Sequence, residues 1–398
     1  MIAPPTRVAA PLAEPLFLAF LLCLLLIPWP LGSNRDWLWP VFTATFALIA
    51  LARVWRRTPL DIPVVPAAAF VALLAWLSLQ AFGIPGVLEP ISVDPYLTTG
   101  YLLRAATLAT VFFLVINLTR TPSHLAMLLM FMTAAGVVQA VAGIVQVSEH
   151  AFPDPSGSFA SPNHYAASLY FSLFTALSLG GWYRTRLLMF LVAMAAASLL
   201  LMLLLSGSRM GIAATIAAAA GVAVLVPLAS RWSVTGTVVL TGFSVLAVLA
   251  AIVVTSLNAG EALSSSIPRI ELVRSSLALI SDYGLTGAGG GTFQLAFAAY
   301  RTPEIFDTVI HADNDYLQLV AELGVPGVLA LTTLLLAALL RQFGGAVAAG
   351  RERWIHIGML GATLAMLGHA FTDANLQVPA NATWFVVILA IPFTRPAG

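Results

Sequence analysis

The most constraining feature of the sequence is a series of long apolar runs separated by short polar segments. Each run is about 17–25 residues long, which is the length that crosses the apolar core of a bilayer as an α-helix. The chain is therefore predicted to be an all-α, polytopic membrane protein with about 12 transmembrane helices. The runs cover residues 13–31, 37–53, 62–82, 98–117, 124–147, 164–181, 187–206, 210–228, 234–257, 325–341, 354–372 and 378–394.

The composition supports a membrane environment and excludes an ordinary soluble domain. Hydrophobic residues make up 60% of the chain and charged residues only 9%, whereas charged residues make up about a quarter of a soluble domain. The first run has no small-residue cleavage site followed by a soluble domain, so we expect a retained helix. Residues 1–398 are expected to form a single integral membrane domain, and the net charge of +1 gives no sign of a nucleic-acid partner.

The distribution of basic residues predicts the orientation in the membrane. All 18 basic residues are arginine. If the N-terminus starts in the cytoplasm and each run crosses once, twelve of the 18 arginines but only three of the 17 acids lie in cytoplasmic segments. This is the bias of the positive-inside rule. It predicts that both termini lie in the cytoplasm and that the other loops face the exterior, which in a bacterium is the periplasm.

The largest exterior segment, 258–324, is predicted to be a periplasmic loop of about 65 residues with two helical pieces. Between these pieces, "TGAGGGTF" (286–293) lacks the lysine of a nucleotide-binding loop and is expected to be a flexible turn or a nest of backbone amides. The second piece is "HADNDYLQLVAELGVPG" (311–327), where His311, Asp315, Gln318 and Glu322 recur at helical spacing. We expect an amphipathic helix on the membrane surface that breaks at Gly324 and Pro326.

The arginines that depart from the positive-inside pattern are candidate anion ligands. Taken singly, each can pair with an exterior acid or extend to lipid phosphate. Taken together, they can converge on one external cavity and bind an anionic, phospholipid-like head group, because guanidinium holds phosphate oxygens in a bidentate manner. Arg209, in "SGSRMG" (206–211), also lies near a helix N-terminus, which favours anions. These arginines are Arg35, Arg104, Arg209, Arg269, Arg274 and Arg301.

His311 is the candidate general base. It stands beside carboxylates, of which Asp313 or Asp315 could orient its ring, and a neutral imidazole there could remove a proton from an acceptor hydroxyl. The aspartates of "DND" (313–315) could instead be a metal pair of the kind found in nucleotide-sugar enzymes. Nucleotide sugars are not available outside the cytoplasm, so no metal or other cofactor is expected. In "SFASPNHYAA" (158–167), His164 lies at the mouth of the sixth run, and helix capping could account for Asn163.

Several motifs together resemble the O-antigen ligase and polymerase superfamily. They are "PLGSNRDWLW" (30–39), "GSFASPNHYAA" (157–167), "SGSRMG", "PRIELVRSSLALISDYGLTGAGGGTF" (268–293) and "HADNDYLQLVAELGVPG", and the resemblance spans roughly residues 25–380. One departure is that the family often has an aromatic residue just after the loop arginine, where this chain has Leu272 and Val273.

The resemblance implies a membrane glycosyltransferase of the GT-C type that acts without metal. Such enzymes transfer a glycan from undecaprenyl diphosphate to an acceptor hydroxyl at the periplasmic face of the membrane. The motif histidine corresponds to His311 and the short-loop arginine to Arg209. The large-loop arginine corresponds best to Arg269, with Arg274 next. The remaining residues expected to contact substrate are Arg35, Arg104, Asp313, Asp315, Asn163, His164 and Tyr316.

The acceptor and one other function class stay open at this point. A ligase transfers the glycan to lipid A core, a polymerase to another lipid-linked repeat, and a third type to protein. The third ranks last because no long C-terminal periplasmic domain is present. A transporter or flippase of lipid-linked glycans is the alternative function, but transporters usually bind substrate near the midplane, where this chain has few polar residues. An inverting transferase is therefore the favoured prediction.

Overall fold

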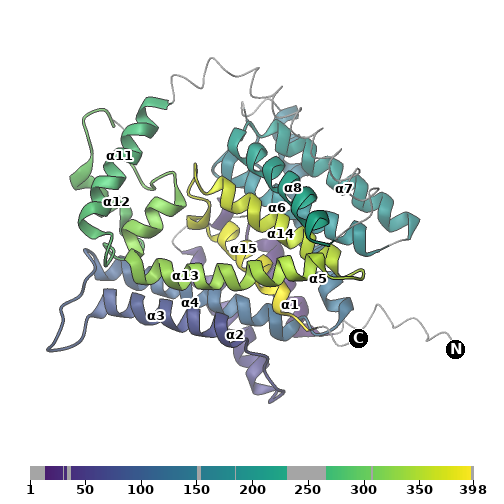
Figure 1. Cartoon of the computed structure of the whole chain (residues 1–398), viewed down its shortest axis with the longest axis horizontal. Coiled ribbons are helices and arrows are strands. Elements are labelled where there is room, and N and C mark those ends of the chain that lie inside the picture. The colour runs from purple at the N-terminus through teal and green to yellow at the C-terminus, as the bar shows by residue number, and fades with distance from the viewer. Residues whose placement is uncertain are drawn as a thin grey trace.

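The fold was examined in a computed structural model that describes residues 14–29, 31–33, 37–149, 154–183, 185–230, 266–305 and 308–395. Within these residues the chain is a bundle of helices (Figure 1), and the only extended pairing is a single β-bridge between Ile84 and Leu88. The long helices are α1 (Pro15–Leu26), α2 (Leu38–Trp55), α3 (Val64–Phe82), α4 (Pro95–Leu118), α5 (Pro122–Ser148), α6 (Pro162–Trp182), α7 (Arg186–Leu205), α8 (Arg209–Ser230), α11 (Ser266–Tyr283), α13 (Asp315–Val347), α14 (Arg353–His369) and α15 (Pro379–Ala390). The short ones are α12 (Phe293–Phe297) and the 3₁₀ turns η2 (Leu31–Ser33), η3 (Ala298–Tyr300), η4 (Asn375–Gln377) and η5 (Ile391–Phe393).

The predicted fold class is confirmed. Eleven of the twelve apolar runs coincide with helices, and the run at 234–257 lies outside the described residues. Among the described helices, seven are long and apolar enough to cross a membrane, namely α2, α3, α4, α5, α7, α8 and α13. The protein is thus an all-α, multi-pass membrane protein, while the number of twelve spans stays a prediction.

Local sequence explains where several helices begin. Asp94, Thr121 and Ser161 each stand at an N-cap, and their side chains accept hydrogen bonds from backbone N–H groups of the first turn. A proline follows each cap, at the first helical position, where the missing N–H costs nothing. The cap of α6 is therefore Ser161, and not Asn163, for which capping was considered.

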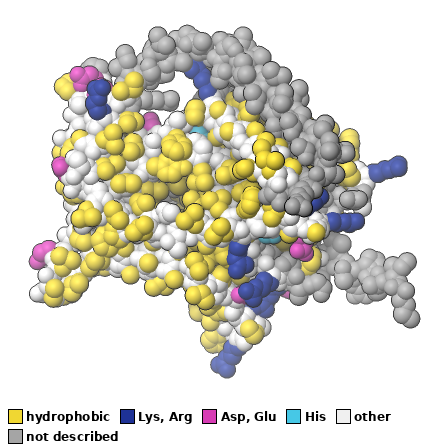
Figure 2. All heavy atoms as spheres, in the orientation of Figure 1, with side chains coloured by type: hydrophobic (Ala, Val, Ile, Leu, Met, Phe, Trp, Pro, Cys, Tyr) yellow, Lys and Arg dark blue, Asp and Glu magenta, His cyan; other side chains and the backbone are white. Residues whose placement is uncertain are grey.

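The helices form two groups that meet along α13, α14 and α15. In one group α3 packs against both α4 and α13, and in the other α6 lies at the centre, in contact with α5, α7, α8 and α14 (Figure 1). The core between them is densely packed with large side chains such as Phe112, Tyr170, Phe171 and Trp384, all at most 1% exposed. Hydrophobic side chains cover much of the visible surface, with charged side chains toward its edges (Figure 2).

Segments predicted to lie on the same side of the membrane do meet in the structure. At one end Arg53 donates to the carbonyl oxygens of Asn117 and Pro59, and Arg395 pairs with Asp61 at 3.8 Å. All of these lie at or beside loops predicted to be cytoplasmic. At the other end, the Val93 N–H donates to the Ala288 carbonyl at 2.9 Å, which joins two loops predicted to be exterior. In these two cases, loops predicted to lie on the same side of the membrane contact each other. Which side is the cytoplasm and which the periplasm stays a prediction.

Helix α13 differs from the expected surface helix in one respect. The break occurs at Gly324, which has φ 60° and ψ −170°, as the sequence predicted. The polar face before this kink, however, is turned into the protein, since Asp315, Gln318 and Glu322 are 0%, 2% and 1% exposed. The amphipathic pattern therefore places carboxylates and an amide inside the bundle instead of in water.

Candidate functional site

His311 lies just before α13, and the buried polar face of that helix holds its ring. The Gln318 side-chain nitrogen is 3.3 Å from His311 Nδ1 and also donates to Glu322 Oε1 at 3.1 Å. The other end of the same amide accepts a hydrogen bond from the Ala312 N–H at 3.2 Å. Burial is the main cause that lowers the pKa of His311 to about 4, and the charge of His164 acts in the same direction. His311 is thus neutral at pH 7.

The glycine-rich turn at 286–293 anchors this polar face. The Phe293 N–H donates to Glu322 Oε1 at 3.0 Å, and the Gly289 N–H donates to the Glu322 carbonyl at 3.0 Å. Gly287 has φ 78°, and a Cβ there would come within 2.2 Å of that carbonyl oxygen. The backbone amides of the turn therefore hold a carboxylate of the chain itself, so the turn serves to position the start of α13.

His164 is held by an acid that the sequence analysis did not single out. Its Nε2 atom lies 3.3 Å from Oδ1 of Asp373, in the loop between α14 and α15. Burial alone would raise the pKa of Asp373, but the hydrogen bond and the charge of His164 lower that pKa below its ordinary value. The charges of both residues also act on His311, so the two histidines share one site. The only sequence signal for Asp373 is an acid four residues after His369.

Two further polar side chains complete the buried part of the site. Asp315 is fully buried, and its Oδ2 atom accepts a hydrogen bond from the Leu376 N–H at 3.0 Å. Its other oxygen, Oδ1, has no hydrogen-bond partner among the described residues, nor does either ring nitrogen of the fully buried His369. The side-chain contact of His311 Nδ1 is with Gln318, and orientation of the ring by Asp315 stays a prediction.

Three other predicted substrate-binding residues, Asp313, Tyr316 and Asn163, differ in their surroundings. Asp313 is exposed with φ 47°, and it does not share an environment with the buried Asp315. The two carboxylates therefore do not form the metal pair that was considered for "DND". Tyr316 donates its hydroxyl to the Leu367 carbonyl at 2.7 Å, which ties α13 to α14. Asn163 lies in the first turn of α6, one position before His164.

Four of the six candidate arginines lie on three helices, α4, α8 and α11. Arg209 begins α8, whose first turn lies against His369, since a Cβ on Gly211 would be 3.2 Å from that ring. Arg269 lies in the first turn of α11, and in the same helix Arg274 is exposed and pairs with Glu271 at 2.6 Å. Arg301 donates to the Ile305 carbonyl at 2.7 Å. Arg35 lies outside the described residues.

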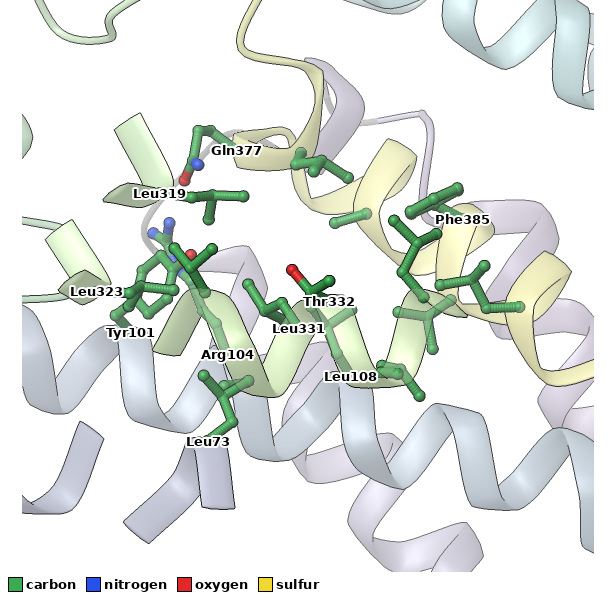
Figure 3. Close-up of a pocket in the computed structure, with 18 of the residues that line it drawn as sticks. Leu73, Tyr101, Arg104, Leu108, Leu319, Leu323, Leu331, Thr332, Gln377 and Phe385 are labelled. Atoms are coloured by element: carbon green, nitrogen blue, oxygen red, sulfur yellow. The ribbon is translucent and has the colours of Figure 1, made fainter. Parts of the chain in front are cut away.

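Arg104 lies apart from the other arginines, on α4, and lines a cavity of about 250 Å³ between α4, α13 and α15 (Figure 3). Leucine, phenylalanine and other apolar side chains form most of the wall. Arg104, Tyr101 and Gln377 lie together at one end of the drawn residues, while Leu108, Thr332 and Phe385 lie toward the other. The charge of Arg104 also acts on the His311 ring, so this end of the cavity adjoins the histidine site.

Comparison with known proteins gives a family for part of the chain. The family model described as O-antigen ligase matches residues 194–332, a segment that contains Arg209, Arg269, Arg274 and His311. His164, Asp373 and Arg104 lie outside the matched segment. No curated protein is similar enough to the chain to be matched to it.

Proposed function

We propose that this chain, a member of the O-antigen ligase and polymerase superfamily through residues 194–332, transfers a glycan from undecaprenyl diphosphate to an acceptor hydroxyl. The family match supports a ligase- or polymerase-type role in surface glycan assembly. The single observation that carries the mechanism is a neutral His311 that lies at the inward polar face of α13, within the matched segment. A histidine in this state can accept a proton at neutral pH.

The proposed step is a direct displacement at the anomeric carbon of the donor. The acceptor oxygen forms the new glycosidic bond while the bond from the anomeric carbon to the diphosphate oxygen breaks. The electron pair leaves with undecaprenyl diphosphate, and the hydroxyl proton passes to His311. Attack from the side opposite the leaving group inverts the anomeric centre.

The geometry indicates which nitrogen of His311 takes the proton. A neutral imidazole has one N–H and one lone pair. The amide nitrogen of Gln318 faces Nδ1, which favours the lone pair on Nδ1 and the hydrogen on Nε2. At 3.3 Å this contact is longer than an ordinary hydrogen bond. An acceptor hydroxyl could therefore displace it, while Gln318 keeps its hydrogen bonds to Glu322 and to the Ala312 N–H.

Arginines would stabilise the leaving diphosphate. Arg209 at the start of α8 combines a guanidinium with the N-terminal end of a helix dipole, and Arg269 in α11 would approach from the large loop. Arg274 and Arg35 would assist. Preorganised positive charge of this kind is usually a large part of transition-state stabilisation. It removes the need for a divalent cation, so we propose metal-independent transfer.

His164 would bind the acceptor beside His311. Because Asp373 holds Nε2, the other nitrogen, Nδ1, is available to a sugar hydroxyl. Asp373 acts through His164 and is a positioning residue, as the aspartate is in other histidine–aspartate pairs. Asp313, Asn163 and Tyr316 are proposed to contact the glycan.

The location of the site follows from the arginine distribution. His311 lies in the large loop 258–324, which is exterior when the N-terminus is cytoplasmic. We therefore propose an active site on the periplasmic face of the bacterial inner membrane, in a GT-C-like arrangement, with both termini in the cytoplasm. The polar groups gather at one end of the bundle, which favours transfer chemistry over the transporter alternative.

Reconstitution tests this function directly. The full chain in proteoliposomes would receive a radiolabelled oligosaccharide on undecaprenyl diphosphate, with lipid A core, a lipid-linked repeat or a peptide as acceptor. We expect label to move to one of the first two, at an unchanged rate in EDTA. Movement of intact donor across the bilayer without a new glycosidic bond would instead establish the transporter. Loss of transfer in EDTA that magnesium or manganese restores would overturn the metal-independent step.

A further inference from the structure

The cavity beside the histidine site has the elongated shape of a lipid chain. Its wall is formed by one face of each of three helices, α4, α13 and α15, because the lining residues recur at helical spacing along each. These residues are Tyr101, Arg104, Ala105 and Leu108 from α4, Val328, Leu331, Thr332 and Leu335 from α13, and Pro379, Ala382, Val386 and Leu389 from α15. At about 1.5 Å per residue, the stretch of α15 along the cavity extends for about 15 Å. The cavity therefore runs along the helices, in the direction that a lipid chain takes in a bilayer.

One end of this cavity is polar. The Arg104 guanidinium makes no hydrogen bond or ion pair within 4 Å to another residue in the described part of the chain, although its charge acts on the nearby Glu322. Glu322 already accepts hydrogen bonds from Gln318 and the Phe293 N–H. The Arg104 guanidinium thus lies at one end of an otherwise largely apolar cavity (Figure 3).

The cavity lies on the opposite flank of His311 from Arg209. Arg209 is on α8, which packs against α6 and α14, whereas Arg104 is on α4, which packs against α3 and α15 (Figure 1). The charges of His164 on α6 and of Arg104 on α4 both act on the His311 ring, so the base lies between the flanks. Because the donor diphosphate is proposed to bind Arg209 and Arg269, the flank that contains Arg104 is available for the acceptor.

We propose that this cavity binds the prenyl chain of a lipid-linked acceptor and that Arg104 binds the acceptor's phosphate. The assignment rests on the proposed transferase function and gives the acceptor a class, a glycan on a single-chain lipid phosphate. With such an acceptor, the reaction is a polymerisation between two lipid-linked glycans. A guanidinium suits a phosphate head group, and the apolar wall suits a prenyl chain.

The test separates binding of the acceptor from binding of the donor. The donor is the labelled repeat unit on undecaprenyl diphosphate with its acceptor hydroxyl replaced by hydrogen, so that it cannot also react as an acceptor. The acceptor is the same repeat unit on a geranylgeranyl chain through a phosphonate, which cannot act as a donor, or the free repeat unit in water. KM is measured for each substrate in the reconstituted wild type and in Arg104→Gln, Thr332→Phe and Thr333→Phe. Thr332 lines the cavity and its neighbour Thr333 does not, so the last variant is the matched control.

We expect Arg104→Gln to raise KM for the lipid-linked acceptor by about tenfold, the size expected for a lost charge-assisted hydrogen bond. Thr332→Phe should also raise this KM, because the larger side chain would occupy part of the cavity. KM for the donor and for the free repeat unit should not change, and Thr333→Phe should behave as wild type. A rise in donor KM would mean that the cavity binds the donor. An unchanged acceptor KM in both variants would mean that the cavity does not bind the acceptor. Either result overturns the proposal. Absence of transfer to every acceptor by wild type would instead refute the proposed function.

Discussion

The two histidines at one end of the bundle have different partners. His311 contacts the neutral amide of Gln318 at 3.3 Å, while His164 is paired with the carboxylate of Asp373 at 3.3 Å. The half-buried His311 ring stays uncharged, because the Gln318 contact and the charge of Asp373 only partly offset the cost of burying a cation. A carboxylate fixes its histidine strongly and in one orientation. We therefore propose that His311 transfers the proton and that His164 orients the substrate.

Removal of His311 should give the largest effect. We expect His311→Ala to slow single-turnover transfer by about 10²–10⁴-fold, the usual loss for a missing general base, with donor binding intact. His124, which lies 3.7 Å from Glu14 at the opposite end of the bundle, provides the control. His124→Gln should retain transfer. If well-folded His311→Ala protein transfers normally, the two histidines have been assigned the wrong way round.

Asp373 should matter less than His311, because it acts through His164. Asp373→Asn removes one charge-assisted hydrogen bond, for which we expect a loss of roughly 10–100-fold in kcat/KM for the acceptor. Asp373→Glu should recover part of the loss, since it restores the charge. Donor KM is the readout that separates this role from general damage to the fold. A parallel rise in donor KM would count against an acceptor-positioning role.

Gln318 should have a smaller effect than either. Gln318→Met keeps the side-chain volume but removes a neutral hydrogen bond to the His311 ring, for which a loss of roughly 2–10-fold in transfer is expected. The measurement is single-turnover rate alongside the thermal unfolding midpoint. A loss of stability without any loss of rate would mean that Gln318 serves only the buried Glu322 and not His311.

Much of the fold could be predicted from local patterns. The apolar runs gave eleven helices that the structure describes, and prolines after Asp94, Thr121 and Ser161 marked three helix starts. Gly324 marked the kink in α13 because a left-handed backbone favours glycine. Each of these features depends on residues within one or two turns of each other, so periodicity and capping rules apply.

The site could be predicted only in part, because its contacts join distant segments. The segment around His311 was recognisable from its polar residues, but the pattern does not tell whether a polar face turns toward water or inward. That choice depends on the glycine turn, whose amides bind Glu322. The pairing of His164 with Asp373 joins residues more than 200 positions apart. The cavity below Arg104 needs three helix faces to meet, which no local pattern encodes.

The pH dependence of transfer by the wild type tests most directly whether a neutral His311 is the base. The base form exists above the pKa, so a pKa of about 4 leaves about 90% of His311 neutral at pH 5. We therefore expect the single-turnover rate to change by less than about twofold between pH 7.5 and pH 5. A histidine with the ordinary pKa of about 6.5 would be only about 3% neutral at pH 5. A fall of about 30-fold over this range, with a midpoint near 6.5, would contradict the account.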